Sequence, residues 1–187
     1  MKVEMKGIDV ANAMKEDLTA RVESLKRKGT EPCLTIVRVG ARPDDLAYER
    51  GARKRMEAIG ITCKVLELRE DISQEEFETE FSRVNEDPAV HGILLFRPLP
   101  EHLNEDPVRM MIHPSKDVDC MSPVNMSKVF SGDETGFAPC TPEAVVDMLD
   151  HYRIDLQGKK VVIIGRSMVV GKPLSMLLLK RHATVTI

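Results

Sequence analysis

The stretch that decides the fold is Lys159–Pro173, which reads KKVVIIGRSMVVGKP. Within it, Val161–Ile164 is a short run of β-branched apolar residues, and such a run predicts a strand buried on both faces. Gly165 follows at a point where a side chain would block a tight turn or a close ligand. Residues 174–181 then predict a helix. A strand, a glycine turn and a helix N-terminus together favour a phosphate site, because backbone N–H groups and the helix dipole attract negative charge.

The side chains and spacing of this turn leave two interpretations open. Arg166 and Ser167 add a guanidinium group and a hydroxyl group to the turn. The spacing differs from the G-x-G-x-x-G fingerprint, since Ser167 stands at the position of the second glycine and Val170 at that of the third. Taken alone, the stretch fits a dinucleotide site and an ordinary strand–helix turn equally well.

Length and composition describe a globular chain and argue against several functions. The sequence has 187 residues, of which 42% are hydrophobic and 30% charged, with a net charge of −3. That charge argues against non-specific nucleic-acid binding, and no apolar run approaches the ~20 residues that a membrane helix needs. Residues 1–6 are mixed and charged and lack the apolar core of a signal peptide, which predicts a cytoplasmic protein. The four cysteines are far apart, which indicates reduced thiols and no metal site.

The first two thirds of the chain predict alternating helices and strands. Strands are expected at Cys33–Val39, Thr62–Leu68 and Val90–Phe96. A first helix is expected after an N-cap at Asp9, with an apolar face of Val10, Met14, Leu18, Val22 and Leu25. A second is expected at Asp45–Ile59, where Gly60 ends it. A third should follow the capping box of Ser73 and Glu76, and a short fourth is expected at Val108–Ile112. This βαβαβ order predicts an N-terminal α/β domain with a parallel sheet, which we place at residues 1–120.

The last third predicts an incomplete second domain. Residues 114–142 hold four prolines and little periodicity, which indicates an irregular crossing between domains. Pro142 suits the first turn of a helix through Leu149, and a final strand is expected at Ala183–Ile187. Residues 121–187 thus predict the start of a Rossmann-like dinucleotide-binding domain, because that fold needs two βαβαβ halves and only about one βαβ unit is present. The final strand would also be an exposed apolar edge, so we expect the sequence to be part of a longer chain.

Three groups of motifs, taken in order along the chain, resemble one enzyme family. They are Val39-Gly40, Pro43, Tyr48 and Gly60-Ile61; then Gly92-Ile93-Leu94, Pro98-Leu99-Pro100, Lys116-Asp117-Val118-Asp119 and Pro123-Val124-Asn125; then Pro139-Cys140-Thr141-Pro142, Gly165-Arg166-Ser167 and Val170-Gly171-Lys172-Pro173. Over nearly the whole chain they resemble the methylenetetrahydrofolate dehydrogenase/methenyltetrahydrofolate cyclohydrolase family. The resemblance implies a two-domain α/β enzyme, usually a homodimer, with tetrahydrofolate derivatives bound in a cleft between the domains. It also implies that NAD or NADP takes a hydride from the folate's methylene bridge, and that the methenyl product is hydrolysed to 10-formyl-tetrahydrofolate.

The resemblance also implies site residues. Tyr48 matches the family's active-site tyrosine, and Asp119 matches the aspartate whose carboxylate suits the N–H donors of the pterin. These two are the candidate catalytic residues; the alternatives are a core tyrosine on a helix and a loop aspartate that bonds nearby backbone. The candidate folate-binding residues are Tyr48, Ala52, Leu95, Phe96, Arg97, Pro98 and Asp119. The candidate cofactor-binding residues are Gly165, Arg166, Ser167, Val170, Gly171 and Pro173.

Two positions depart from the family pattern. Ala52 stands where the family has a catalytic lysine, one helical turn after the tyrosine, and Phe96 stands where it has a glutamine that bonds this lysine. Lys54 does not replace the lysine, because two residues along a helix are about 200° around it. Arg97 does not replace the glutamine, because it points to the other side of an extended chain. Cys120 replaces a glycine, which is a milder change.

These departures predict a change of activity. Hydrolysis needs a group that moves protons, such as a lysine with a tuned pKa, whereas hydride transfer mainly needs two rings held in register. We therefore expect a dehydrogenase that has lost cyclohydrolase activity. The alternatives are a bifunctional enzyme with another proton carrier, a folate-binding module without catalysis, and an unrelated dinucleotide-binding protein. The choice between NAD and NADP stays open, because it usually rests on side chains beyond the second Rossmann strand.

Overall fold

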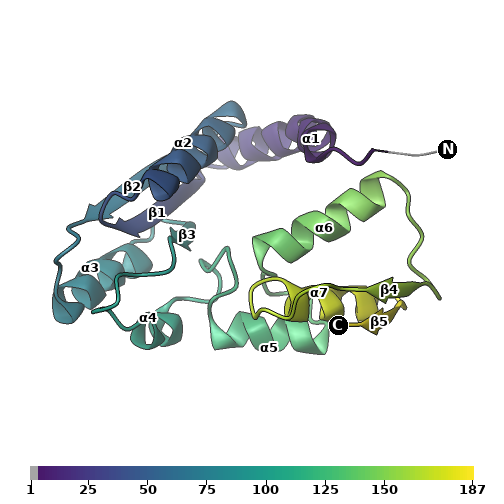
Figure 1. The fold of residues 1–187 in the computed structure, drawn as a ribbon. Helices are drawn as coiled ribbons and strands as arrows, with labels where there is room; N and C mark the ends of the chain where they lie inside the picture. Colours follow the sequence, from purple (N-terminus) through teal and green to yellow (C-terminus); the bar gives the residue numbers. More distant parts are fainter. Residues whose placement is uncertain (1–3) are drawn as a thin grey trace. The chain divides into compact units, whose positions relative to one another are not determined.

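The computed structural model describes residues 4–187, and the chain divides into two compact units (Figure 1). The N-terminal unit is Lys15–Asp117, and the C-terminal unit is Val118–Ile187 together with the chain up to Met14. In chain order the elements are α1 (Gly7–Arg27), β1 (Cys33–Val39), α2 (Pro43–Ala58), β2 (Thr62–Leu68), α3 (Gln74–Glu86), β3 (Gly92–Leu95), α4 (Asp106–Met111), α5 (Pro123–Ser131), α6 (Cys140–His151), β4 (Lys160–Val162), α7 (Gly171–Lys180) and β5 (Thr184–Thr186). None of the helices described is both long and apolar enough to cross a membrane.

The N-terminal unit is built on a parallel sheet with strand order β2-β1-β3, as the βαβαβ pattern predicted. Strands β1 and β2 have the predicted bounds, whereas β3 is shorter than the predicted Val90–Phe96. The backbone N–H of His91 and that of Phe96 still donate to β1, at 2.9 Å each. The strand pairing therefore holds Phe96 at the end of the sheet. The core combines strand and helix residues, among them Ile36, Val37, Ile93, Phe77 and Phe81.

The helix boundaries of this unit follow local signals in most cases. The capping box that begins α3 is confirmed, since the Ser73 hydroxyl accepts from the Glu76 N–H and the Glu76 carboxylate accepts from the Ser73 N–H. Helix α2 begins two residues before the prediction because Pro43 suits a first helical turn. Gly60 follows this helix with φ of +83°, as a glycine stop requires.

The first helix differs from its prediction in two respects. Helix α1 begins at Gly7, so Asp9 lies in its first turn and is not the N-cap. An acidic side chain there is still favourable near the positive end of the helix dipole. The predicted apolar face is only partly buried: Val10 and Val22 are buried, whereas Met14 and Leu25 are exposed.

The C-terminal unit contains a short parallel pair, β4 and β5, packed on one side only. Its core cluster is Val146, Leu156, Leu174, Leu178 and Ala183. Val161 and Ile163 pack against this cluster, but Val162 is 71% exposed and Ile164 fully exposed. The prediction of a strand buried on both faces is therefore wrong for the residues described, because alternate side chains of a strand point to opposite faces and one face here is uncovered.

The proline-rich stretch 114–142 contains a helix, α5, that its sequence pattern did not predict. Ser122 caps α5, its hydroxyl accepting from the Val124 N–H at 3.1 Å, and Pro123 occupies the first turn. Gly132, with φ of +75°, ends the helix. Proline here begins a helix, because the first turn lacks partners for its N–H groups in any case.

Candidate functional site

The sheet of the N-terminal unit has a topological switch point between β1 and β3. After the central strand β1 and helix α2, the chain forms β2, which pairs with one side of β1. Strand β3 pairs with the other side of β1. In open parallel sheets, ligands bind at the carboxyl ends of strands beside such a point. Tyr48 lies on α2, which follows β1, and Phe96 directly follows β3. The topology therefore brings α2, which contains Tyr48, and the segment after β3, which contains Phe96, to the same edge of the sheet.

Tyr48 and Phe96 are in direct contact at this edge. Their ring centroids are 5.3 Å apart with an interplanar angle of 58°. Tyr48 is 59% exposed, whereas Phe96 is 6% exposed. Tyr48 is thus a surface ring supported by a buried one, which contradicts the alternative of a core tyrosine. An exposed aromatic face backed by a fixed ring suits stacking against a flat ligand.

Among the other predicted folate-binding residues of this unit, none is a lysine on the face of α2 that carries Tyr48. Ala52 lies one turn after Tyr48 and is half-buried. Lys54 is exposed two residues further on, about 200° around the helix. The Arg97 guanidinium lies 3.9 Å from the Glu105 carboxylate. Of the others, Leu95 is buried and Pro98 is exposed.

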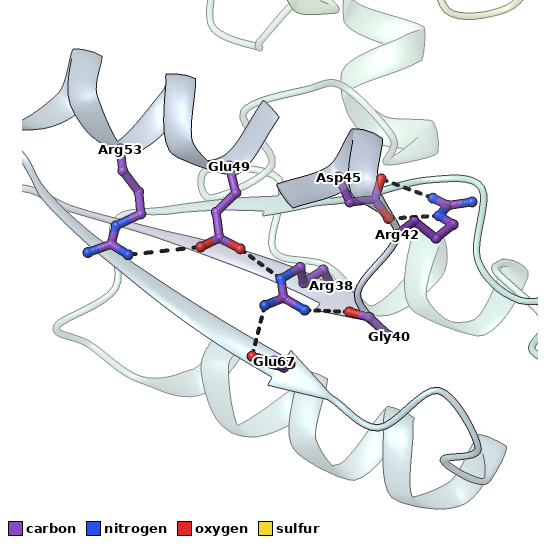
Figure 2. A network of polar contacts seen from close by, with 7 residues as sticks. All are labelled: Arg38, Gly40, Arg42, Asp45, Glu49, Arg53 and Glu67. Carbon is purple, nitrogen blue, oxygen red and sulfur yellow. Dashed lines mark hydrogen bonds and ion pairs between the residues drawn. The ribbon is translucent and has the colours of Figure 1, made fainter. Parts of the chain in front are cut away.

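A charge network whose centre, Arg38 and Glu49, is buried anchors α2 (Figure 2). Arg38 of β1 donates to Glu49 of α2 at 2.7 Å and to Glu67 of β2 at 2.8 Å, and it also donates to the carbonyl of Gly40. Near the start of the helix, the Arg42 guanidinium donates two hydrogen bonds to the Asp45 carboxylate. Figure 2 also shows Arg53 of α2, whose guanidinium lies 3.9 Å from the Glu49 carboxylate. The helix that carries Tyr48 is thus tied to two strands and to the turn before it.

Asp119 belongs to the C-terminal unit and caps a helix there. Its Oδ1 accepts from the N–H of Cys140, the first residue of α6, at 3.1 Å. This contact matches the alternative of a loop aspartate that bonds backbone. An ionised carboxylate has about four acceptor positions, so the capping role and a ligand role are compatible.

Two residues close to Asp119 in the sequence, Lys116 and Cys120, shape the backbone by hydrogen bonds and by conformation, respectively. The Lys116 ammonium donates to the carbonyls of Asn85 and Asp87 at 2.7 Å each and so holds the end of α3. Cys120 adopts a left-handed φ of +55°. A non-glycine residue pays about 1–2 kcal/mol for that conformation, which gives a physical reason for the glycine that the family resemblance implies at this position.

The predicted cofactor turn follows β4 in the C-terminal unit. Gly165 has φ of +130°, and a Cβ built there would meet nothing within 4 Å. A Cβ on Gly171 would lie 1.9 Å from the carbonyl oxygen of Gly165. Gly171 is thus the residue that lets the helix N-terminus pack on the turn. Gly171 lies one residue after Val170, which stands at the position of the fingerprint's third glycine.

The side chains of the turn are suited to an anion. Arg166 and Ser167 are exposed beside the first turn of α7. The Ser167 hydroxyl accepts from the Val170 N–H at 3.1 Å, and the Ser167 carbonyl accepts from the Lys172 N–H at 3.1 Å. These bonds hold the turn in shape. The Ser167 O–H retains its proton for donation, and an exposed guanidinium at a helix N-terminus fits a phosphate group.

A separate cavity of about 590 Å³ lies in the C-terminal unit, away from this turn. Its lining includes Glu143 and Asp147, which are one turn apart on α6. Burial raises the pKa of both carboxyl groups, and the charge of Asp147 raises the pKa of Glu143 further. None of the predicted cofactor residues from Gly165 to Pro173 lines the cavity.

These features define an α/β protein with a candidate ligand site at the edge of one parallel sheet and a candidate phosphate site at the turn after β4. Residues 5–119 match the family described as "Tetrahydrofolate dehydrogenase/cyclohydrolase, catalytic domain". Residues 139–187 match "Tetrahydrofolate dehydrogenase/cyclohydrolase, NAD(P)-binding domain". The chain therefore belongs to the tetrahydrofolate dehydrogenase/cyclohydrolase family, as the motifs predicted.

Individual relatives agree with this assignment. The chain is 61% identical to the "Bifunctional protein FolD" of Clostridioides difficile over 98% of its own length and 64% of the relative's length. A Trypanosoma brucei methylenetetrahydrofolate dehydrogenase-cyclohydrolase, solved with NADP and an inhibitor, has a TM-score of 0.91 at 36% identity, over 98% of this chain and 63% of that one. The structure of a Bombyx mori 5,10-methylenetetrahydrofolate dehydrogenase has a TM-score of 0.95 at 31% identity, over 100% of this chain and 68% of that one. The chain thus spans about two thirds of the length of these relatives.

Proposed function

We propose that the complete protein carrying this sequence oxidises 5,10-methylene-tetrahydrofolate to 5,10-methenyl-tetrahydrofolate, and that it has lost the cyclohydrolase step. The observation that carries the proposal is the contact between the Tyr48 and Phe96 rings, 5.3 Å apart. It puts an apolar ring where the family resemblance implies a glutamine. Ala52, one helical turn after Tyr48, puts a methyl group where it implies a lysine.

Hydrolysis requires a group that gives and takes protons near the folate. Tyr48 offers a phenol in place of an amine. The Arg97 guanidinium, 3.9 Å from the Glu105 carboxylate, offers N–H donors and no acceptor. Lys54 lies on another side of α2. These positions support loss of the hydrolytic step.

Hydride transfer makes smaller demands on the protein. It needs the folate ring and the cofactor ring held in register, and no proton carrier. Tyr48 would stack on the folate, and Asp119 would accept from its N–H donors. Arg166, Ser167 and the N-terminus of α7 would hold the phosphates of the cofactor. NAD or NADP, when bound, supplies the ring that accepts the hydride.

The test restores both missing groups in the complete protein. The double variant Ala52→Lys with Phe96→Gln should produce 10-formyl-tetrahydrofolate faster than the uncatalysed rate, because the lysine regains its place and its partner. Ala52→Lys alone should recover less, because Phe96 offers that lysine no hydrogen bond. A double variant that folds and binds folate but leaves hydrolysis at the uncatalysed rate would show that the roles are assigned wrongly. Lys54→Ala serves as the control and should leave the product profile unchanged.

The bifunctional activity is the second candidate, since the Clostridioides difficile relative at 61% identity is named "Bifunctional protein FolD". It predicts that methenyl-tetrahydrofolate never accumulates and that another side chain carries the proton. We further propose, from the family resemblance, that the complete protein is a cytoplasmic homodimer with a folate-binding domain at residues 1–120 and a cofactor domain from residue 121. Sedimentation of the purified protein tests the dimer.

A further inference from the structure

Helix α2 is attached to its sheet by a charge. Among its residues, Glu49 is the most deeply buried, at 9% exposure. Surface helices are normally held by an apolar stripe that faces the core. Here the Glu49 carboxylate accepts from Arg38 at 2.7 Å, and Arg38 is only 5% exposed on the central strand. The helix that carries Tyr48 is therefore held by this ion pair together with the half-buried apolar residues Leu46, Ala52 and Met56.

The Arg38 guanidinium bonds in three directions (Figure 2). One N–H group reaches α2 through Glu49, another reaches β2 through Glu67, and a third reaches the carbonyl of Gly40 in the turn before α2. Arg53, one turn after Glu49, places a second guanidinium 3.9 Å from the same carboxylate. A planar guanidinium with its donors engaged on three segments restricts rotation and sliding of the helix.

The network is suited to setting geometry more than to adding stability. Burial by itself lowers the pKa of Arg38, but its hydrogen bonds to Glu49 and Glu67 outweigh burial and raise that pKa. The Arg38 guanidinium therefore stays charged at physiological pH. Desolvation largely cancels the attraction within a buried ion pair, and apolar residues of similar volume often replace such a pair without loss of stability.

We propose that Arg38 and Glu49 are positioning residues that set the rotation of α2 and so hold Tyr48 over Phe96 for the folate. The proposal rests on the proposed function. Glu49 and Tyr48 are adjacent, about 100° apart on the helix, so any rotation that releases Glu49 also moves the Tyr48 ring. A side chain lies about 5–6 Å from the helix axis, so a rotation of about 10° moves it by about 1 Å. Such a displacement can reduce a reaction rate about 100-fold.

The test replaces the pair by apolar residues in the complete protein, Arg38→Met with Glu49→Leu. This variant should unfold at nearly the same urea concentration as the parent, because both charges leave together. Its dehydrogenase kcat/KM should fall by about 10- to 100-fold, with a raised KM for the folate and an unchanged KM for the cofactor. The matched control is Glu80→Gln with Arg83→Gln, which removes an exposed ion pair from α3 and should change neither constant.

A spectroscopic measurement separates this inference from the proposed activity. The contribution of Tyr48 is obtained by subtracting the spectrum of the matching Tyr48→Phe variant, because all other aromatic residues of the complete protein are common to both. The near-ultraviolet circular dichroism of Tyr48 should weaken in the double variant while the far-ultraviolet spectrum is kept. An unchanged Tyr48 signal would overturn the positioning role, whether or not the parent is active. A parent protein without dehydrogenase activity would refute the proposed function instead, and the Tyr48 signal would still decide the role of the pair.

Discussion

Replacing Gly171 by alanine tests the packing of the cofactor turn. The added Cβ would lie 1.9 Å from the carbonyl oxygen and 2.6 Å from the carbonyl carbon of Gly165. Both neighbours are backbone atoms, so no side-chain rotation relieves the overlap. Either the turn or the first residue of α7 must move by more than 1 Å to restore an ordinary contact.

We expect Gly171→Ala to lower the free energy of unfolding by about 2–3 kcal/mol, at the upper end of the usual penalty for overpacking. The matched control is Gly51→Ala. Gly51 lies inside α2 and is exposed, and a Cβ there would meet nothing within 4 Å. Alanine is favoured over glycine in a helix by about 0.8–1.0 kcal/mol, so the control should gain stability. The same substitution is thus predicted to have opposite signs at the two positions.

The assay is urea unfolding of the chain followed by circular dichroism. The fluorescence of Tyr152 in a Tyr48→Phe background reports the C-terminal unit separately, because Tyr152 belongs to that unit. Cofactor affinity should fall together with stability in Gly171→Ala, because the displaced turn carries Arg166 and Ser167. A Gly171→Ala protein as stable as the parent would refute the close packing of the turn against α7.

Two further predictions concern stability. The pKa values of Glu143 and Asp147 are raised in the folded state, so each ionised carboxylate destabilises the fold once the pH exceeds the pKa of the unfolded chain. Glu143→Gln and Asp147→Asn should therefore raise the urea midpoint at neutral pH and lose this advantage in acid. A stabilisation that grows in acid would contradict this sign. Ser73→Ala removes the capping box of α3 and should cost about 1 kcal/mol, while Thr79→Ala on the exposed middle of the same helix should cost less, as urea unfolding would measure.

Local chemistry explains which parts of the fold were predictable. Strands β1 and β2 and the capping box of Ser73 follow from short-range patterns, and their predicted positions agree with the structure. Helix α5 was missed because prolines were taken as breakers, although Ser122 before Pro123 is an N-cap signal. The exposure of Val162 was missed because β-branched content predicts a strand but not which faces are covered.

The candidate site was predictable where the family motifs mark a position. Tyr48 and Phe96 were both singled out, but their ring contact depends on the β2-β1-β3 order. The pairing of Arg38 with Glu49 was not foreseen, because a charge in a strand and a charge on a helix have many possible partners until the two are packed. Gly171 was assigned to the cofactor turn, but its role in packing depends on the backbone path of Gly165.

The most direct measurement of the central claim supplies the complete protein with 5,10-methylene-tetrahydrofolate and either NAD or NADP, and follows both folate products over time. We predict that methenyl-tetrahydrofolate accumulates and that 10-formyl-tetrahydrofolate forms only at the uncatalysed rate, with one of the two cofactors preferred. Rapid formation of 10-formyl-tetrahydrofolate without accumulation of the methenyl compound would contradict the account, because hydrolysis would then proceed with alanine at position 52 and phenylalanine at position 96.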